Sequence, residues 1–421
     1  MTKRTNLRPQ LKPISKPALK FLWMIRKKRH LSLSSRRSST ATDMPDGCAA
    51  VLTDHEDVLV EILARLPVKT LIRFRCVCTA WRSLISDPHF LKKQRKYDAE
   101  RGVNDSDLRL LFSMKPPSSM GLVDLKGLKD AELAKRFRED RVATRELDFP
   151  VSLDHGYEIV NVGTCNGIIC IQFNRGEYAL WNPCTGEYNV LPKPSVFCYP
   201  RYYGFGYDEI NDDYKVVKGS HCETDGNGPL KPLIQVFSLR KGTWKTYPGP
   251  KNVCMRGQGA FVNGKLHWLW FEEWWKSESK EIRPFSLAEE KFQEVMPIPW
   301  NNIGGILISG NRLCVHSETG AVRIVMMKEY GVKESWTEVL YLTIFTVPQI
   351  YDEICKVKPL WILENGDVLA YTVQQGGYLS LYKPKDKAFR NVIKPEGSYR
   401  FESVIYRETF VSPVTGNLGE I

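Results

Sequence analysis

Acidic side chains are missing from the first 42 residues of the chain, which hold twelve basic ones between Lys3 and Arg37. The rest of the 421 residues is electrically neutral, so the formal net charge of +12 belongs to this N-terminal stretch alone. Charge therefore gives no support to nucleic-acid binding by the folded part. Because residues 1–45 also have few apolar side chains, they cannot bury enough surface to fold, and we expect a disordered basic extension.

Long hydrophobic runs are missing as well. The longest uncharged apolar run near the N-terminus covers residues 21–25, which is too short for a membrane span or a secretory signal. The eleven cysteines are an odd number without a regular spacing, which favours free thiols in a reducing compartment over disulfides. We expect a soluble protein of the cytoplasm, the nucleus or both, without a membrane partner.

The basic extension permits three interpretations. Its densest part is a candidate nuclear localisation signal: Arg26, Lys27, Lys28 and Arg29. The whole stretch also has the Arg-rich, Ser-rich and acid-free composition of an organelle transit peptide. In the third interpretation it has no function, and residues 1–43 are not translated if Met44 is the start codon.

Signatures of catalysis and of metal binding are absent from the sequence. It contains no His-Glu-x-x-His and no Gly-x-Ser-x-Gly motif. The cysteine pairs Cys76 and Cys78, and Cys165 and Cys170, have no histidine nearby at the spacing of a zinc site, which favours buried thiols over ligands. We predict no catalytic residue, no metal ligand and no cofactor.

Residues 54–94 have the periodicity of helices. Asp54 and Asp57 are a candidate N-cap and first-turn acid, and the apolar positions after them sweep roughly 240° of a helical wheel before Pro67. A second series of apolar residues repeats in steps of three and four: Leu71, Phe74, Cys78, Trp81 and Ile85. This much apolar surface indicates either a subdomain packed on the rest of the chain or a docking surface for helices of a partner.

This helical module resembles the plant-type F-box over residues 61–69, 74–78 and 81–90. The resemblance implies binding to a Skp-type adaptor and, through it, to a cullin and a RING ubiquitin ligase. By their position in the motif, six residues resemble the adaptor-facing set of the family: Pro67, Val68, Leu71, Val77, Cys78 and Trp81.

The resemblance also implies that Ile62, Leu63 and Phe74 serve the core of the module itself. One departure from the family lies at its start, where Asp54 and His55 stand in place of Leu-Pro. That departure leaves the affinity of the first adaptor contact open.

From residue 108 to 411 the pattern changes to short strands separated by turns, and it repeats. The first half of the repeat is a hairpin whose turn suits the type I′ geometry: Asn166-Gly167, Asn263-Gly264, Gly310-Asn311 and Asn365-Gly366. The second half is a strand anchored on one large apolar residue: Trp181, Phe237, Phe285, Val325 and Tyr382. These anchors are 56, 48, 40 and 57 residues apart, close to the length of a four-stranded propeller blade.

Five units are visible, and a sixth can be assembled from residues 108–114, 122–125 and 403–411. This last unit would join the two ends of the domain and so remove the exposed sheet edges. The predicted fold class is α+β multidomain, a small all-α F-box followed by an all-β propeller-like domain of about six blades. The expected organisation is a basic extension (1–45), an F-box (52–95), a linker (96–107), a propeller (108–411) and a tail (412–421).

The repeat region resembles the F-box-associated interaction domain of plants, a kelch-like propeller. Four stretches carry the likeness: 162–167, 181–186, 203–217 and 261–268. It lacks the Trp-Asp dipeptide of WD repeats and the spaced aromatic residues of a true kelch blade. With the F-box, the resemblance implies a non-catalytic substrate-recognition subunit of an SCF-type (Skp, cullin, F-box) ubiquitin ligase, which delivers an unknown target protein for ubiquitination and degradation.

Two aromatic pairs are candidates for contact with a target. Trp274 and Trp275 follow an acidic pair and precede a polar stretch, so we expect them at a loop tip, where exposed tryptophan is typical of a protein-binding hot spot. Tyr202 and Tyr203 are a second candidate on the same argument. Ordinary packing within a blade is the alternative for both pairs.

Two other functions stay open at this point. In one, the propeller binds a glycan or a small ligand, with Trp274 and Trp275 as stacking platforms. In the other, scattered polar residues meet inside the ring and form the site of an enzyme. The sequence does not name the target, because propeller loops vary independently of their scaffold.

Overall fold

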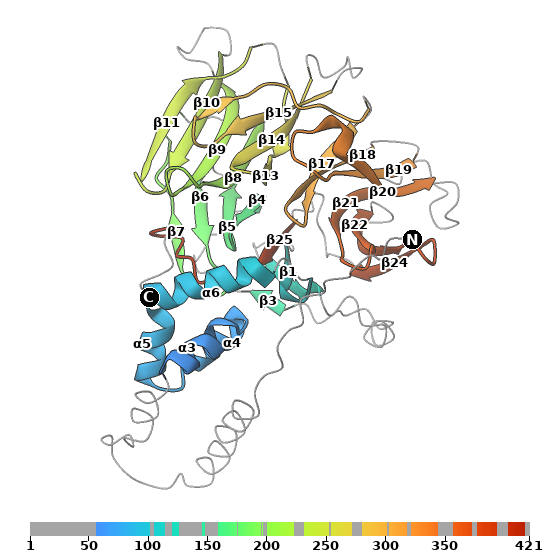
Figure 1. Ribbon diagram of the computed structural model, residues 1–421. Coiled ribbons are helices and arrows are strands. Elements are labelled where there is room, and N and C mark those ends of the chain that lie inside the picture. The colour runs from blue at the N-terminus through green and yellow to red at the C-terminus, as the bar shows by residue number, and fades with distance from the viewer. Residues whose placement is uncertain are drawn as a thin grey trace, which may run out of the picture. The chain divides into compact units, whose positions relative to one another are not determined.

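The computed structural model describes residues 56–101 and most of residues 105–416 (Figure 1). The gaps in the second range are 114–119, 126–144, 148–158, 175, 195, 197–199, 223–230, 252–253, 272–279, 301–302, 318–320, 344–356, 373–376 and 394–402. Within the described ranges, no helix combines the length and the apolar composition that a membrane span requires. The predicted basic extension and the departure at Asp54 and His55 lie outside the described residues.

The helical module consists of four helices: α3 (Glu56–Ala64), α4 (Val68–Phe74), α5 (Thr79–Ser86) and α6 (Pro88–Arg101). The second apolar series of the sequence is divided between α4 and α5, because the backbone of Cys78 is extended. Asp87 ends α5 and starts α6, since its carboxylate accepts hydrogen bonds from the backbone N–H groups of His89 and Phe90 at 2.8 and 3.1 Å. Helix α6 then continues to Arg101, six residues into the range expected to be a linker.

All four helices contribute to the core of the module. Its buried residues include Leu63 and Ala64 of α3, Leu71 of α4, Ile85 of α5, and Phe90 and Leu91 of α6. The ring of Phe74 packs edge-on against that of Trp81, with 5.2 Å between the ring centres. Side chains from α3 to α6 therefore hold the module together.

The propeller consists of six sheets, so the predicted fold class is confirmed and the number of blades is six. From the innermost to the outermost strand, blade 1 consists of β25 (Ser403–Arg407), β1 (Leu108–Ser113), β2 (Met120–Asp124) and β3 (Arg145–Leu147), and blade 2 of β4 (Ile159–Cys165), β5 (Ile168–Phe173), β6 (Tyr178–Trp181) and β7 (Tyr188–Val190). In the same order, blade 3 consists of β8 (Tyr202–Asp208), β9 (Asp213–Cys222), β10 (Lys231–Ser238) and β11 (Thr243–Pro248), and blade 4 of β13 (Ala260–Val262), β14 (Lys265–Trp270), β15 (Glu281–Ser286) and β16 (Lys291–Phe292). Blade 5 consists of β17 (Ile303–Ser309), β18 (Arg312–Ser317), β19 (Ala321–Met327) and β20 (Trp336–Thr343), and blade 6 of β21 (Val357–Ile362), β22 (Val368–Thr372), β23 (Tyr378–Lys383) and β24 (Ala388–Ile393). A short strand, β12 (Gly257–Gln258), pairs in parallel with β8 at the inner edge of blade 3.

The hairpin turns between the first two strands of the blades follow the sequence prediction at three of four places. Both turn residues have positive φ at Asn166-Gly167, Asn263-Gly264 and Gly310-Asn311, as a type I′ turn requires. At Asn365-Gly366 only the glycine has positive φ, at 85°. The prediction of a type I′ turn is wrong there, because the turn spans one more residue and is closed by a hydrogen bond from the N–H of Gly366 to the carbonyl oxygen of Leu363.

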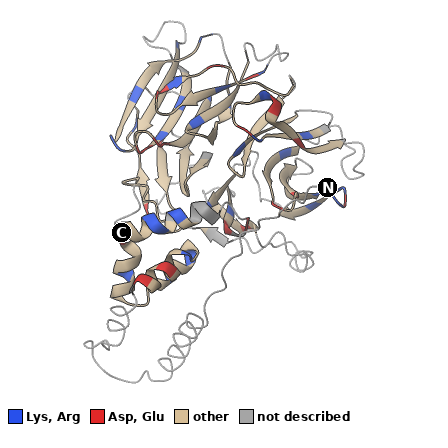
Figure 2. Ribbon diagram, viewed as in Figure 1, with Lys and Arg blue, Asp and Glu red and all other residues tan. Residues whose placement is uncertain are grey.

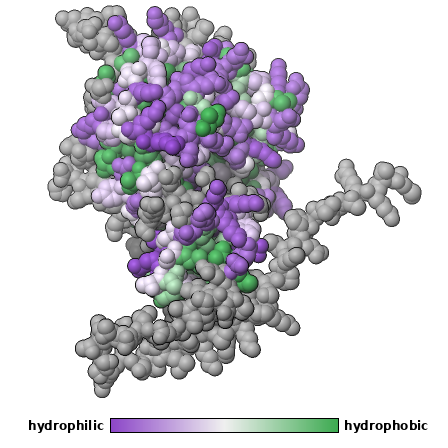
Figure 3. Space-filling model, turned by 60° about the vertical axis from the view of Figure 1, so that its left-hand side comes forward, coloured by the Kyte–Doolittle hydropathy of each residue, from purple (hydrophilic) through white to green (hydrophobic). Residues whose placement is uncertain are grey.

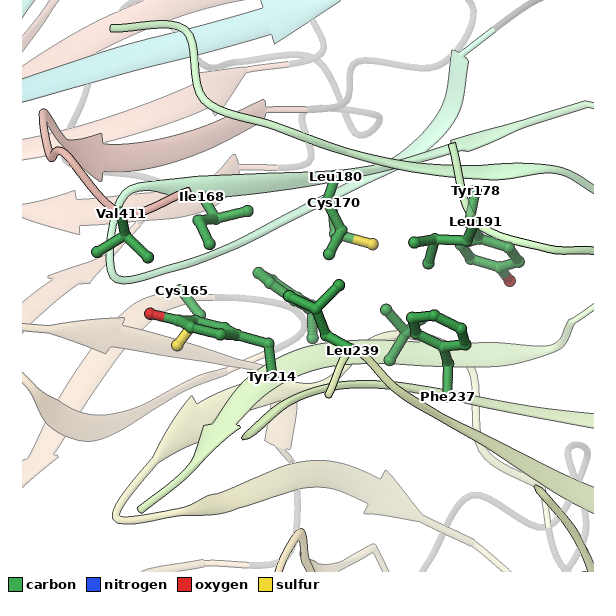
Figure 4. Packing of buried hydrophobic residues seen from close by; sticks show 12 residues of the cluster. Cys165, Ile168, Cys170, Tyr178, Leu180, Leu191, Tyr214, Phe237, Leu239 and Val411 are labelled. Carbon is green, nitrogen blue, oxygen red and sulfur yellow. The ribbon is translucent and has the colours of Figure 1, made fainter. Parts of the chain in front are cut away.

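Six clusters of buried residues fill the interfaces between neighbouring blades, one cluster for each interface. Between blades 2 and 3, Cys170 and Leu180 face Tyr214 and Phe237 (Figure 4). A fully buried leucine, isoleucine or phenylalanine stabilises the fold by about 1.5 to 3 kcal/mol. The blades are therefore held to one another by continuous apolar packing around the ring.

The two ends of the domain meet in blade 1, as the sequence predicted for the sixth unit. Strand β25, from the C-terminal end, pairs antiparallel with β1, with Leu108 opposite Arg407 and Phe112 opposite Ser403. On the other side of the closure, the carboxylate of Asp105 accepts a hydrogen bond of 2.7 Å from the backbone N–H of Glu364, which follows the innermost strand of blade 6. The ring is closed without a free inner strand.

The chain continues past β25 and is anchored to blade 2. The side-chain amide of Asn182 donates hydrogen bonds to the carbonyl oxygens of Thr409 and Val411, at 3.0 and 2.9 Å. The amide of Asn189 donates to the carbonyl oxygen of Pro413, at 3.3 Å. Residues 408–416, which we call the C-terminal strap, thus belong to the propeller and extend beyond the end expected at 411.

Candidate functional site

The helical module exposes large apolar side chains. Val58 of α3 is 56% exposed and Val77, between α4 and α5, is 39% exposed. In the space-filling view, hydrophobic residues gather over the helices among hydrophilic ones (Figure 3). Exposed valines of this kind are the side chains that a partner's apolar surface would cover.

The six residues predicted to face the adaptor lie in different environments. Pro67 and Val77 are exposed, and Cys78 is half-buried. Val68, Leu71 and Trp81 are buried within the module, whereas Phe74, expected in its core, is half-buried. Contact of the six with an adaptor stays a prediction, and only Pro67, Val77 and Cys78 offer surface for it in this structure.

A polar cluster joins α3 to α6. The carboxylate of Glu61 binds Lys93 at 2.5 Å, accepts a hydrogen bond from the hydroxyl of Tyr97 at 2.5 Å, and lies 3.2 Å from the guanidinium of Arg65. The bonds from Lys93 and Tyr97 lower the pKa of Glu61. Figure 2 shows the acidic residues of α3 and the basic residues of α6 in this module. The polar residues Glu61 and Arg65 of α3 thus lie against α6, which leaves the apolar residues of α3 for the core and for the surface.

The propeller has two unlike faces. In an antiparallel four-stranded blade, the turns between strands one and two and between strands three and four lie at one end. The turn between strands two and three and the connection to the next blade lie at the other end, which we call the loop face. Many connections on the loop face are long, among them 191–201, 223–230, 271–280, 293–302, 344–356 and 394–402, although 174–177, 318–320 and 373–377 are short. At the opposite end the connections are two to six residues long, except for residues 125–144 between β2 and β3 and residues 328–335 between β19 and β20.

The first predicted target-binding pair falls in a connection of blade 4. Trp274 and Trp275 belong to the connection between β14 and β15, which places that connection on the loop face of blade 4. Both residues lie outside the described residues, so their contact with a target stays a prediction.

The second predicted pair lies in the core. Tyr202 and Tyr203 begin β8 and are both buried, and the ring of Tyr202 packs edge-on against Trp268 with 5.3 Å between the ring centres. These two tyrosines therefore offer no exposed surface to a target. In β14, Trp268 and Trp270 pack on one face of the sheet and Leu269 packs on the other.

One buried lysine has a complete set of partners. The ammonium of Lys215 in blade 3 lies 3.0 Å from Asp208, 2.8 Å from Glu290 and 2.6 Å from the carbonyl oxygen of Leu287 in blade 4. Burial alone would lower the pKa of Lys215, but the hydrogen bonds that its ammonium donates to Glu290 and Asp208 outweigh burial and raise it. The hydroxyl of Tyr247 also donates to Glu290. This network joins two blades and has no unused group for chemistry.

The buried histidine of blade 4 is also fully partnered. Nδ1 of His267 lies 2.9 Å from the carbonyl oxygen of Ala260, and Nε2 lies 2.6 Å from the hydroxyl of Tyr330 in blade 5. Burial lowers the pKa of His267 to about 4, so the ring is neutral near pH 7. Because both ring nitrogens are occupied, the arrangement supports a structural role for this histidine.

Thiols and metal-binding groups give no other candidate in the described part of the chain. The cysteines described there are free, and burial raises the pKa of Cys314 to about 12, so its thiol stays protonated. No three His, Cys, Asp or Glu side chains in that part are grouped so that they could hold a metal ion.

Comparison with known proteins identifies both parts of the chain. A four-helix module followed by a closed six-bladed propeller defines the class of protein. The family model of the F-box associated beta propeller domain matches residues 132–403, and that of the F-box domain matches residues 55–93. The chain belongs to the F-box associated beta propeller family, and its helical module is an F-box domain.

Three relatives from Arabidopsis thaliana illustrate this family. The chain is 28% identical to F-box/kelch-repeat protein At3g23880 over 377 residues, which cover 85% of this chain and 95% of the relative. It is 26% identical to F-box protein At3g07870 over 408 residues, 84% of this chain and 90% of the relative. It is 28% identical to F-box protein CPR1 over 338 residues, 72% of this chain and 76% of the relative.

Proposed function

We propose that the chain is the substrate-recognition subunit of an SCF-type E3 ubiquitin ligase. The observation that carries this proposal is the pairing of an F-box domain that exposes apolar side chains with a propeller whose loop face carries several long connections. The F-box binds a Skp-type adaptor and, through it, the cullin and the RING protein. The loop face of the propeller binds the target protein.

The subunit itself is not a catalyst in this proposal. Holding a target near the ubiquitin-conjugating enzyme raises its effective concentration there, and this tethering is enough to accelerate transfer of ubiquitin. The full hydrogen bonding of Lys215 and His267 supports a receptor role, because neither side chain has a free group to offer to a reaction.

Adaptor binding is tested by co-purification of the full chain with a Skp-type adaptor. Val58 and Val77 are exposed, so replacing both by glutamate leaves the core of the F-box intact while it places charge on the docking surface. We expect the double variant Val58→Glu, Val77→Glu to lose the adaptor. The matched control is Val190→Glu, at a valine of similar exposure in the outermost strand of blade 2. It should bind the adaptor as the unchanged protein does.

Two results would contradict this part of the proposal. One is failure of the unchanged chain to bind any Skp-type adaptor, and the other is adaptor binding by the double variant with unaltered affinity. Circular dichroism and thermal unfolding of the double variant establish that it is folded, which separates loss of docking from loss of structure.

Target binding is tested by proximity labelling from the full chain in cells in which proteasomal degradation is blocked. Replacement of Trp274 and Trp275 by alanine should remove a defined set of labelled proteins, whereas Tyr188→Ala, an exposed aromatic in β7, should not. An identical set of labelled proteins for both variants would remove Trp274 and Trp275 from the target-binding surface.

A further inference from the structure

A second buried lysine of blade 3 has no anionic partner in the described part of the chain. Lys218 lies on β9, three residues after Lys215, and is 1% exposed. Its ammonium lies 5.7 Å from the centre of the Trp244 ring, a cation–π contact. Lys215 on the same strand is neutralised by two carboxylates, whereas no carboxylate of the described residues pairs with Lys218.

Two further buried side chains near Lys218 each have an oxygen without a hydrogen-bond partner, although the amide nitrogen of Gln235 donates to the hydroxyl of Thr246 at 3.4 Å. Gln235, directly opposite Lys218 on β10, is 1% exposed, and its oxygen Oε1 has no partner among the described residues. Tyr178, on β6 of blade 2, is 2% exposed, and its hydroxyl is likewise without a partner there. The ring of Tyr178 lies 5.6 Å from that of Trp244. Trp244 is thus a common neighbour of Lys218 and Tyr178, from two different blades.

These groups lie toward the loop face. Tyr178 is the first residue of β6 and directly follows the turn between β5 and β6, which lies on the loop face. Figure 4 shows the hydroxyl of Tyr178 at one extreme of the apolar cluster between blades 2 and 3. Lys218 lies in the second half of β9, the half that leads toward the connection 223–230. The interface between the two blades is therefore apolar over most of its length and polar near the loop face.

An isolated ammonium, a phenol hydroxyl and an amide oxygen are costly to bury without partners. The ammonium and the hydroxyl both donate hydrogen bonds, and the ammonium is positively charged, so the chemical complement of these two groups is an anionic oxygen. The amide oxygen of Gln235 accepts, so it complements a hydroxyl of the same molecule. Because Lys218 is almost inaccessible, the complement must be small rather than a segment of polypeptide.

We propose that the interface between blades 2 and 3, near the loop face, binds a small molecule that carries a carboxylate or phosphate group, held by Lys218 and Tyr178. This proposal goes beyond the docking of adaptor and target, because it gives the propeller a small-molecule ligand of its own.

The test uses the full chain with inorganic phosphate and with acetate, each at constant ionic strength against chloride. We expect at least one of the two anions to raise the midpoint of thermal unfolding in a saturable manner, and the comparison between them distinguishes phosphate from carboxylate. Lys218→Met should weaken the apparent affinity at least tenfold. Tyr178→Phe, which keeps the ring and removes only the hydroxyl, should weaken it several-fold. Lys231→Met, at an exposed lysine of β10, should leave it unchanged.

The proposal is overturned if neither anion gives a saturable shift, or if the response survives in both Lys218→Met and Tyr178→Phe. A crystal structure of the full chain soaked in selenate gives an independent readout. Selenium density at Lys218 supports the site, and ordered water alone in contact with Lys218, Gln235 and Tyr178 refutes it.

Discussion

The unpaired lysine of blade 3 makes a quantitative prediction about stability. Burial lowers the pKa of Lys218 from its ordinary value of 10.5 to about 8. A shift of this size corresponds to roughly 3.5 kcal/mol of destabilisation of the folded state while the lysine is charged, at about 1.4 kcal/mol for each pKa unit. The cation–π contact with Trp244 offsets part of this destabilisation, by about 1 to 2 kcal/mol.

The sign of the pH dependence follows from proton binding. Between pH 8 and 10.5 the unfolded chain keeps the proton on Lys218 while the folded chain has lost it. Stability therefore rises with pH across this window, and the whole penalty is present below pH 8. Lys218→Met removes the charge, keeps a chain of similar length, and should stabilise the propeller at pH 7 by about 1 to 3 kcal/mol. This advantage should disappear by about pH 10.5.

The assay is urea unfolding followed by tryptophan fluorescence at a series of pH values, in chloride buffers free of phosphate and carboxylate. The measured quantity is the difference in unfolding free energy between Lys218→Met and the unchanged chain, so that titration of other groups cancels. Lys231→Met should show no such pH-dependent difference. A variant that is less stable at pH 7, or whose difference from the unchanged chain is the same at pH 7 and pH 10, would refute the reasoning.

Three further predictions concern other buried groups. Glu290→Gln removes one of the two carboxylates of Lys215 and should lower the unfolding free energy by about 2 to 3 kcal/mol in urea, whereas Glu289→Gln, at the exposed neighbour, should change it by less than about 0.5. Because burial lowers the pKa of His267, the neutral ring contributes fully to the stability of the fold above pH 6.5, and this contribution is lost as the pH falls toward 4. His267→Gln should therefore reduce the slope of unfolding free energy against pH between pH 4 and 6.5. An unchanged slope would contradict the role assigned to His267. Gly219→Ala places a methyl group inside the ring of Tyr202 and should lower the thermal midpoint by several degrees. Gly163→Ala should lower it less, because its added carbon would have no neighbour closer than 3.5 Å. Equal effects of the two substitutions would contradict the packing of Tyr202 against Gly219.

The repeat could be predicted from the sequence because turn dipeptides indicate the hairpins of several blades. Asn166-Gly167 and Asn263-Gly264 tolerate the positive φ that a type I′ turn requires at both residues, so these pairs indicate where the flanking strands end and begin. Closure by β25 followed from the need to pair the leftover strands at both ends. The turn at Asn365-Gly366 could not be assigned in this way, because the same dipeptide fits a turn that is one residue longer.

The exposure of individual F-box residues could not be predicted from the sequence. Helix α3 is apolar over most of its circumference, so periodicity gives no single buried side, and the split of the second apolar series at Cys78 changes the direction of the residues beyond it. Leu71 and Trp81 are buried within the module, and periodicity alone does not distinguish this burial from contact with a partner.

Lys218 could not be singled out either. Alternation along β9 places it on the same face as Tyr214 and Val216, and this signal marks a core position. The sequence does not say whether a lysine there finds a carboxylate. For Lys215 the partners come from two segments, and Glu290 is distant in the chain.

Closure of the ring by β25 also has a consequence for synthesis of the protein. The innermost strand of blade 1 is the last strand to leave the ribosome, so β1 keeps an open edge during translation of the other five blades. A chain that terminates early therefore never completes blade 1, and its exposed strand edges make it prone to aggregation. A complete loop face is thus reached only by chains that have been translated at least through β25.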